Sequence, residues 1–129
     1  MNKASASLLF ASLIIAAPTS SRADPITWEY VNVNFDIATT SLSKMRRFAK
    51  ACSLSSAEQV AREFIVSYSA KAHVSAIEVS RLVEDKYTLD PGAFSSQPCE
   101  MKNVTFWTED FRQRSQGLDA ILTQYQLQR

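Results

Sequence analysis

Apolar residues recur with a helical period through most of the chain after residue 36. Spacings of three and four residues place an apolar stripe on one face of a helix over residues 37–52. The stripe of this first predicted helix consists of Leu42, Met45, Phe48, Ala49 and Cys52. A helix with one apolar face must bury that face against another element, so a packed helical domain is expected.

Two Ser-x-x-Glu patterns mark further helix starts. Ser55 with Glu58 and Ser75 with Glu78 match the capping box, in which each side chain bonds the other residue's free backbone N–H. The first predicts a helix that ends near His73 and carries the stripe Val60, Ala61, Phe64, Ile65, Tyr68 and Ala72. The second predicts a helix with the stripe Val79, Leu82, Val83 and Tyr87.

A fourth helix is predicted from Val104 or Thr108 to Leu127, with Thr108 as a candidate N-cap. Its stripe contains Trp107, Phe111, Leu118, Ile121, Leu122 and Tyr125. Gly117 lies inside this helix at a cost of about 1 kcal/mol relative to alanine, which suggests a close approach between two helices there.

The connection before the fourth helix reads as a turn and a loop. Asp90-Pro91-Gly92 is a strong turn signal, because proline fixes φ and glycine accepts positive φ. Residues 93–102 are expected to form a loop in which Phe94 packs into the core.

Residues 24–35 follow a different pattern. Apolar and polar residues alternate there, with β-branched and aromatic types at Trp28, Tyr30, Val31, Val33 and Phe35. This alternation predicts a short strand or an extended arm. Because no second strand is evident, two alternatives stay open: an irregular arm, or a continuation into the first helix.

The first 23 residues have the features of a cleavable signal peptide. Lys3 supplies a positive charge, residues 8–17 form an apolar run, and Pro18 ends it. This run is shorter than the roughly 20 residues that a membrane-spanning helix needs. Ser21 and Ala23 place the cut after Ala23, so that residues 24–129 form a single mature domain.

Export changes the meaning of the charges and the cysteines. Removal of Lys3 and Arg22 leaves 12 basic and 13 acidic residues, a net charge of about −1. A near-neutral chain has no electrostatic footprint for nucleic acid, and no membrane span is expected after residue 23. Cys52 and Cys99, in an oxidising compartment, are expected to form a structural disulfide worth about 4 kcal/mol.

These features together predict the fold class. It is mainly α, a small four-helix bundle-like domain with a short extended N-terminal arm, stapled by one disulfide.

Catalytic and metal-binding chemistry has little support in the sequence. His73 is the one histidine, and it is interpreted as a partly exposed residue at a helix end. No calcium-loop or phosphate-loop motif occurs, and the adjacent carboxylates Glu84-Asp85 and Glu109-Asp110 point in different directions on a helix. We expect no cofactor and no enzymatic activity. A hydrolase with carboxylates from different helices stays a minor alternative.

Two groups of residues form a candidate partner surface. One is the most basic stretch of the chain, and the other is aromatic, a residue class favoured at interface hot spots. The surface comprises Lys44, Arg46, Arg47, Lys50, Trp28 and Tyr30. The competing interpretations are a solvated helix face for the basic residues and a core position for the aromatic ones.

The chain is therefore expected to be an exported, periplasmic, non-enzymatic protein that binds another exported protein. In gross plan it resembles immunity proteins against secreted toxins and periplasmic acid-stress chaperones, a resemblance of architecture that transfers no functional residue. An accessory subunit of an envelope or secretion assembly is a further form of this hypothesis. The alternatives are a small-ligand carrier in a helical bundle and a chaperone-like protein.

Overall fold

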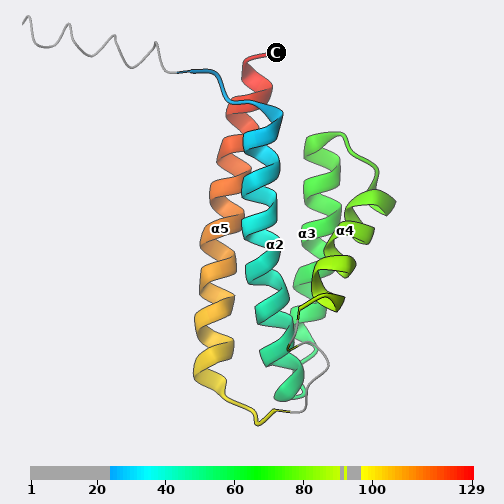
Figure 1. The fold of residues 1–129 in the computed structure, drawn as a ribbon, viewed down its shortest axis with the longest axis vertical. Coiled ribbons are helices and arrows are strands. Elements are labelled where there is room, and N and C mark those ends of the chain that lie inside the picture. Colours follow the sequence, from blue (N-terminus) through cyan, green and yellow to red (C-terminus); the bar gives the residue numbers. More distant parts are fainter. Residues whose placement is uncertain (1–23, 91, 93–96) are drawn as a thin grey trace, which may run out of the picture.

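The computed structural model describes residues 24–90, 92 and 97–129. These ranges contain four helices and no strand: α2 Trp28–Ala51, α3 Ser56–Ala72, α4 Ala76–Thr88 and α5 Met101–Leu127. The two long helices α2 and α5 run side by side in opposite directions, and α3 and α4 lie on the other side of α2 (Figure 1). The predicted fold class is confirmed: helical, with a short N-terminal arm and one disulfide.

Helix α2 holds the domain together because it contacts each of the other helices. Its buried stripe repeats at the spacings of a helix face and meets apolar residues from all three partners. The core cluster contains Val31, Ala38, Leu42, Met45, Ala49, Ala57, Ala61, Tyr68, Val79, Val83, Phe111, Leu118 and Leu122.

The strand predicted for residues 24–35 is not formed. Helix α2 begins at Trp28, with Thr27 as its N-cap, whose Oγ1 accepts a hydrogen bond from the backbone N–H of Tyr30 (3.0 Å). Residues 28–35 instead continue into the first predicted helix, which was one of the two alternatives, because Val31 and Ala38 share a buried face with Leu42. The alternation of apolar and polar residues favours a strand, but burial of Val31 and Ala38 at helical spacing stabilises a helix instead.

The extended arm is therefore shorter than expected and covers residues 24–27. Ile26 is held at both backbone groups by the Gln128 side chain, which accepts from the Ile26 N–H (2.8 Å) and donates to the Ile26 carbonyl (2.9 Å). The first described residues and the C-terminus thus lie at the same end of the bundle (Figure 1).

The helix-start signals of α3 and α4 give the right positions. Ser75 caps α4 as predicted, since its Oγ accepts from the N–H groups of Ile77 and Glu78. Ser55 is the N-cap residue of α3 but makes no side-chain capping bond. Helix α3 ends where predicted, at His73, which adopts the left-handed conformation (φ 59°) of a helix C-cap.

The fourth predicted helix starts earlier than expected. Helix α5 begins at Met101, and the backbone N–H groups of Asn103 and Val104 both bond the Glu100 carbonyl. Thr108 lies inside the helix and is not its cap. The expectation for Gly117 was also wrong, because a Cβ built at this glycine would meet nothing within 4 Å.

The disulfide is confirmed and joins Cys52, at the C-cap of α2, to Cys99, just before α5 (Cα–Cα 4.6 Å). Gly92 donates its N–H to Asp90 Oδ1 (3.0 Å) within the predicted turn, whereas Pro91 and the expected core residue Phe94 lie outside the described residues. Among the described helices, none is long and apolar enough to cross a membrane.

We expect replacement of both cysteines by serine to lower the free energy of unfolding by about 4 kcal/mol, because the reduced chain gains loop entropy when it unfolds. Urea denaturation of the mature protein measures the difference. Dithiothreitol should destabilise the parent and leave the double variant unchanged. Equal stabilities of parent and variant would contradict a structural role for the bond.

Candidate functional site

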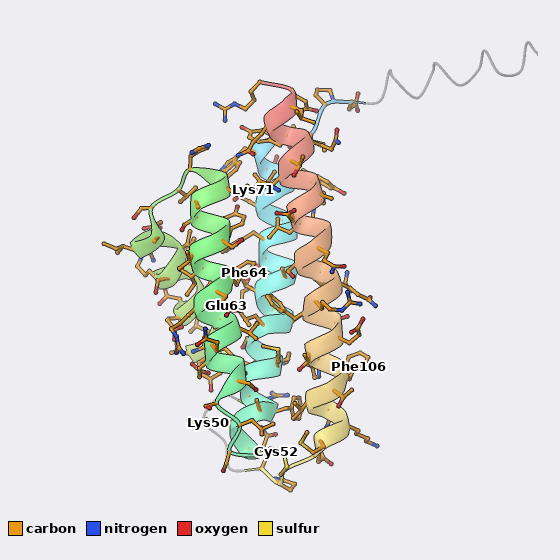
Figure 2. The ribbon with its side chains drawn as sticks, turned by 180° about the vertical axis from the view of Figure 1, so that it is seen from behind. Lys50, Cys52, Glu63, Phe64, Lys71 and Phe106 are labelled. Carbon is orange, nitrogen blue, oxygen red and sulfur yellow. A yellow bond between two sulfur atoms is a disulfide. The ribbon has the colours of Figure 1, made fainter. Side chains whose placement is uncertain are left out.

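A groove runs between α3 and α5, on the side of the bundle shown in Figure 2. Both helices pack on α2 but touch each other at few points, so a space of about 400 Å³ stays open between them. Its apolar floor comes from successive turns of the two helices. The floor residues are Val60, Phe64 and Tyr68 from α3, and Phe111, Leu118 and Leu122 from α5.

Aromatic rings give this floor a fixed shape. Phe64 lies 5.5 Å from Phe111 in an edge-on arrangement and 5.9 Å from Tyr68, centroid to centroid. Tyr68 also packs on Phe35 of α2 at 4.7 Å. Such pairs stabilise the cluster beyond simple area burial. Burial raises the pKa of Tyr68 to about 12, so its phenol stays protonated at physiological pH.

Polar residues line the rim of the groove. At one end, Lys71 Nζ lies 2.7 Å from Asp119 Oδ1, an ion pair that bridges α3 and α5. Gln126 donates to the Lys71 carbonyl at the same end. Towards the other end, Glu63 accepts a hydrogen bond from Gln59 (2.9 Å). Figure 2 shows Glu63, Phe64 and Lys71 in sequence along α3.

The lining chemistry suits binding. An aromatic and aliphatic floor with a polar rim is the pattern of grooves that accept an amphipathic helix. No cluster of three or more histidine, cysteine, aspartate or glutamate side chains in the described ranges is placed to hold a metal ion. His73 is exposed at the end of α3 and does not line the groove.

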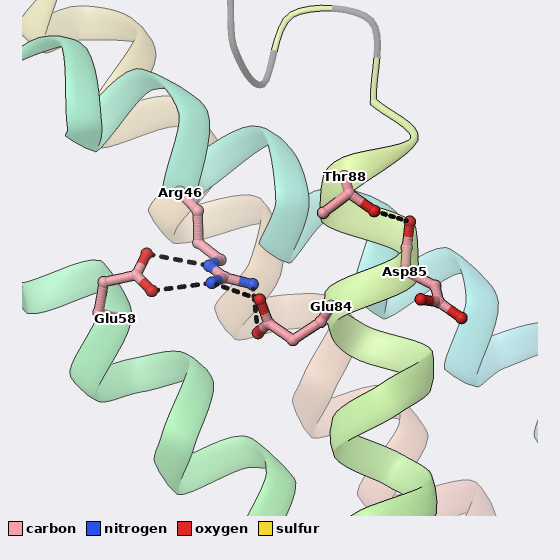
Figure 3. A network of polar contacts seen from close by, with 5 residues as sticks. All are labelled: Arg46, Glu58, Glu84, Asp85 and Thr88. Carbon is pink, nitrogen blue, oxygen red and sulfur yellow. Dashed lines mark hydrogen bonds and ion pairs between the residues drawn. The ribbon is translucent and has the colours of Figure 1, made fainter.

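The sequence-predicted partner surface is divided by the fold. Arg46 points inwards and is 5 % exposed, so it offers no guanidinium to a partner. It bonds Glu58 of α3 through Nε and Nη2 (3.0 and 2.8 Å) and Glu84 of α4 through Nη1 and Nη2 (3.0 and 3.2 Å) (Figure 3). It also lies over the ring of Tyr87 at 4.1 Å. Arg46 therefore joins three helices.

This network shifts the ionisation of its members. Burial alone would lower the pKa of Arg46, but hydrogen bonds and charge from Glu58 and Glu84 outweigh it and raise that pKa. Hydrogen bonding to Arg46 lowers the pKa of Glu58 against the opposing effect of burial. The capping-box glutamate of α3 is thus engaged by Arg46, and the backbone capping pair that its sequence pattern predicts is absent.

Two further basic residues of α2 form ion pairs with Asp90, just after the end of α4. Lys44 and Arg47 lie 3.6 and 3.3 Å from Asp90 Oδ1, and Ser43 Oγ donates to Asp90 Oδ2 (2.8 Å). Burial would raise the pKa of Asp90, but the Gly92 N–H, Ser43 and the two cations together lower it. A Cβ at Gly92 would collide with the Arg47 side chain, so the close approach of Arg47 favours glycine at this position.

The remaining members of the predicted surface lie apart. Trp28 is half-buried and packs on Tyr125 of α5 at 5.5 Å. Tyr30 is 50 % exposed. Lys50 is exposed near the disulfide end (Figure 2). Of the six residues, Tyr30 and Lys44 share the outer side of α2, and the set does not form one patch.

Sequence reasoning missed the groove. Its aromatic residues were assigned correctly to apolar stripes, but a stripe read from sequence does not say which neighbour covers it. The signal that was present is the row Val60, Phe64 and Tyr68, which runs beside a second apolar row, Ala57 and Ala61, on the same helix. Two apolar rows on one helix indicate two packing partners.

No protein-family model, curated protein or solved structure matches this chain. The site is therefore interpreted from its own geometry.

We expect Arg46→Ala to lower the free energy of unfolding by about 3 kcal/mol, because it removes the shared partner of two carboxylates and leaves a gap among three helices. Arg62→Ala is the matched control, since Arg62 is exposed on α3 and bonds only Gln59 among the described residues. It should stay within about 0.5 kcal/mol of the parent. Equal effects in urea denaturation would contradict the central role of Arg46.

We expect Glu58 to make stability depend on pH. The pKa of Glu58 in the folded state lies below the ordinary value of 4.5. Its contribution to the free energy of unfolding is therefore complete above pH 4.5 and is lost as the pH falls through the lower, folded-state pKa. The unfolding free energy of the parent should fall more steeply between pH 5 and 3 than that of Glu58→Gln. Parallel curves for the two proteins would rule this contribution out.

Proposed function

We propose that this chain is an exported protein that acts by binding another protein, whose helix it seats in the groove between α3 and α5. The observation that carries the proposal is the groove itself: two helices that both pack on α2 touch each other at few points, and Val60 and Phe64 stay partly exposed between them. In a regular four-helix bundle, a further helix would cover such a position.

The position is open because α4 lies elsewhere. Helix α4 packs against α2 and α3, and the helix pairs in contact do not include α4 with α5. The floor of the groove runs from Val60 to Lys71 on α3, about 16 Å at the rise of an α-helix. A partner helix of about three turns would match this length.

The shape favours a protein segment over a small molecule. Pockets for small ligands enclose 70–90 % of the ligand surface, whereas this groove has exposed residues along both rims, Glu63 and Ser67 on α3 and Gln116 and Asp119 on α5. Export is supported by the leader-like pattern of residues 1–23 and by the disulfide, a bond typical of oxidising compartments. Together these features favour a periplasmic binding protein without catalytic activity.

Site-specific photo-cross-linking of the exported chain tests this proposal. A photoreactive phenylalanine replaces Ser67, which lines the groove, or Val66, which is 65 % exposed on another face of the same helix. We expect a discrete protein adduct from position 67 only, identified by mass spectrometry. The partner is then purified, and its affinity for the mature chain is measured by calorimetry.

A steric variant completes the test. Ser67→Trp fills the groove without disturbing the core and should weaken binding of the purified partner by at least about tenfold. Val66→Trp is the matched control and should bind like the parent. The proposal fails if both positions cross-link equally, if Ser67→Trp binds normally, or if native mass spectrometry finds a retained small molecule in the groove instead.

A further inference from the structure

The two helices that form the groove run in the same direction. Phe35, in the first half of α2, packs on Tyr68 near the end of α3 at 4.7 Å. Arg46, in the second half of α2, bonds Glu58 near the start of α3. Helix α3 therefore runs opposite to α2. Helix α5 also runs opposite to α2 (Figure 1), so α3 and α5 are parallel to each other.

One end of the groove is closed by bonds between these two helices. Lys71 Nζ of α3 lies 2.7 Å from Asp119 Oδ1 and 3.3 Å from the Asp119 carbonyl oxygen of α5, and Gln126 of α5 donates to the Lys71 carbonyl. Within the described residues, all hydrogen bonds and ion pairs between α3 and α5 lie at this end. A helix seated on the floor is therefore expected to end at Lys71 and Asp119, whereas the other end, at Val60, is open.

Three charged residues line the groove, and one of them has no charged partner. Lys71 and Asp119 neutralise each other across the closed end. Glu63 is exposed and accepts a hydrogen bond from the neutral amide of Gln59 (2.9 Å), but it forms no ion pair with another described residue. Glu63 precedes Lys71 by about 12 Å along α3, at the rise of an α-helix. The third turn of a helix that starts at the closed end would thus reach Glu63.

We propose, on the basis of the function proposed above, that the partner helix begins at the closed end, runs opposite to α3 and α5, and sets a lysine or arginine of its last turn against Glu63. The dipoles of α3 and α5 point the same way, so a helix between them is favoured in the opposite direction. This alternation is that of an up-down-up-down bundle. The partner segment is thus an amphipathic helix of about three turns with a basic end.

The opposite direction meets these conditions less well. It would set the first turn of the partner helix against Glu63, and a lysine or arginine in a first turn is unfavourable with the dipole of its own helix. In the proposed direction the basic residue lies in the last turn, where the same dipole favours it. Direction and charge therefore agree.

Cross-linking at the two ends of the groove tests the direction. A photoreactive phenylalanine replaces Ser56, one turn before Val60 at the open end, or Gln116, which lines the groove within one turn of Asp119. The probe is the purified partner identified by its adduct with position 67. We expect peptide mass spectrometry to map the adduct of position 116 nearer the N-terminus of the partner helix than the adduct of position 56.

The reverse order of the two adducts would overturn the proposed direction and leave the proposed function intact. The absence of any adduct at position 67 would overturn both.

Calorimetry with the same partner tests the role of Glu63. Glu63→Gln should weaken binding about threefold at low ionic strength, the size of an exposed ion pair. This difference should vanish at about 1 M salt, where charges are screened within about 3 Å. Glu63→Lys should weaken binding at least about tenfold at low ionic strength, because like charges then face each other.

Glu29→Gln is the matched control, since it removes an exposed carboxylate of α2 outside the groove, and it should bind like the parent. Circular dichroism should show that all three variants fold. Equal binding of the parent and Glu63→Gln at low ionic strength would overturn the proposal, whereas Ser67→Trp would still report on the groove itself.

Discussion

The apolar stripe of α2 from Val31 to Ala49 is the surface on which the other three helices are assembled. Its members are at most 2 % exposed, and burial of such side chains contributes about 1.5–3 kcal/mol each for the larger ones. Because α2 is shared, any change that tilts or shortens it alters every interface at once. The groove between α3 and α5 exists because both helices pack on α2 and touch each other at few points.

Apolar burial alone does not fix how helices are placed around α2, because it has no direction. The directional contacts do this. Arg46 sets α3 and α4 by its bonds to Glu58 and Glu84, and Asp90 holds the end of α4 against α2. The disulfide fixes the chain at the start of α5 to the end of α2. A basic stretch that suggests a docking surface in sequence is thus largely used inside the domain.

The proposed binding site lies where α3 and α5 diverge. The groove between them has an aromatic and aliphatic floor and a polar rim, a pattern that suits an amphipathic helix from another protein.

The sequence by itself determined the helical class, the apolar stripes of the helices, the start and end of α3, the Ser75 cap and the cysteine pair. These features depend on local spacing and chemistry, which are written in consecutive residues. Tertiary structure decided the rest. Residues 28–35 are helical because Val31 joins the buried stripe of α2. Arg46 points inwards because two carboxylates from distant segments, Glu58 and Glu84, meet there. Phe64 and Phe111 line a groove. Which face of a helix is covered depends on neighbours far away along the chain, and periodicity carries no information about them.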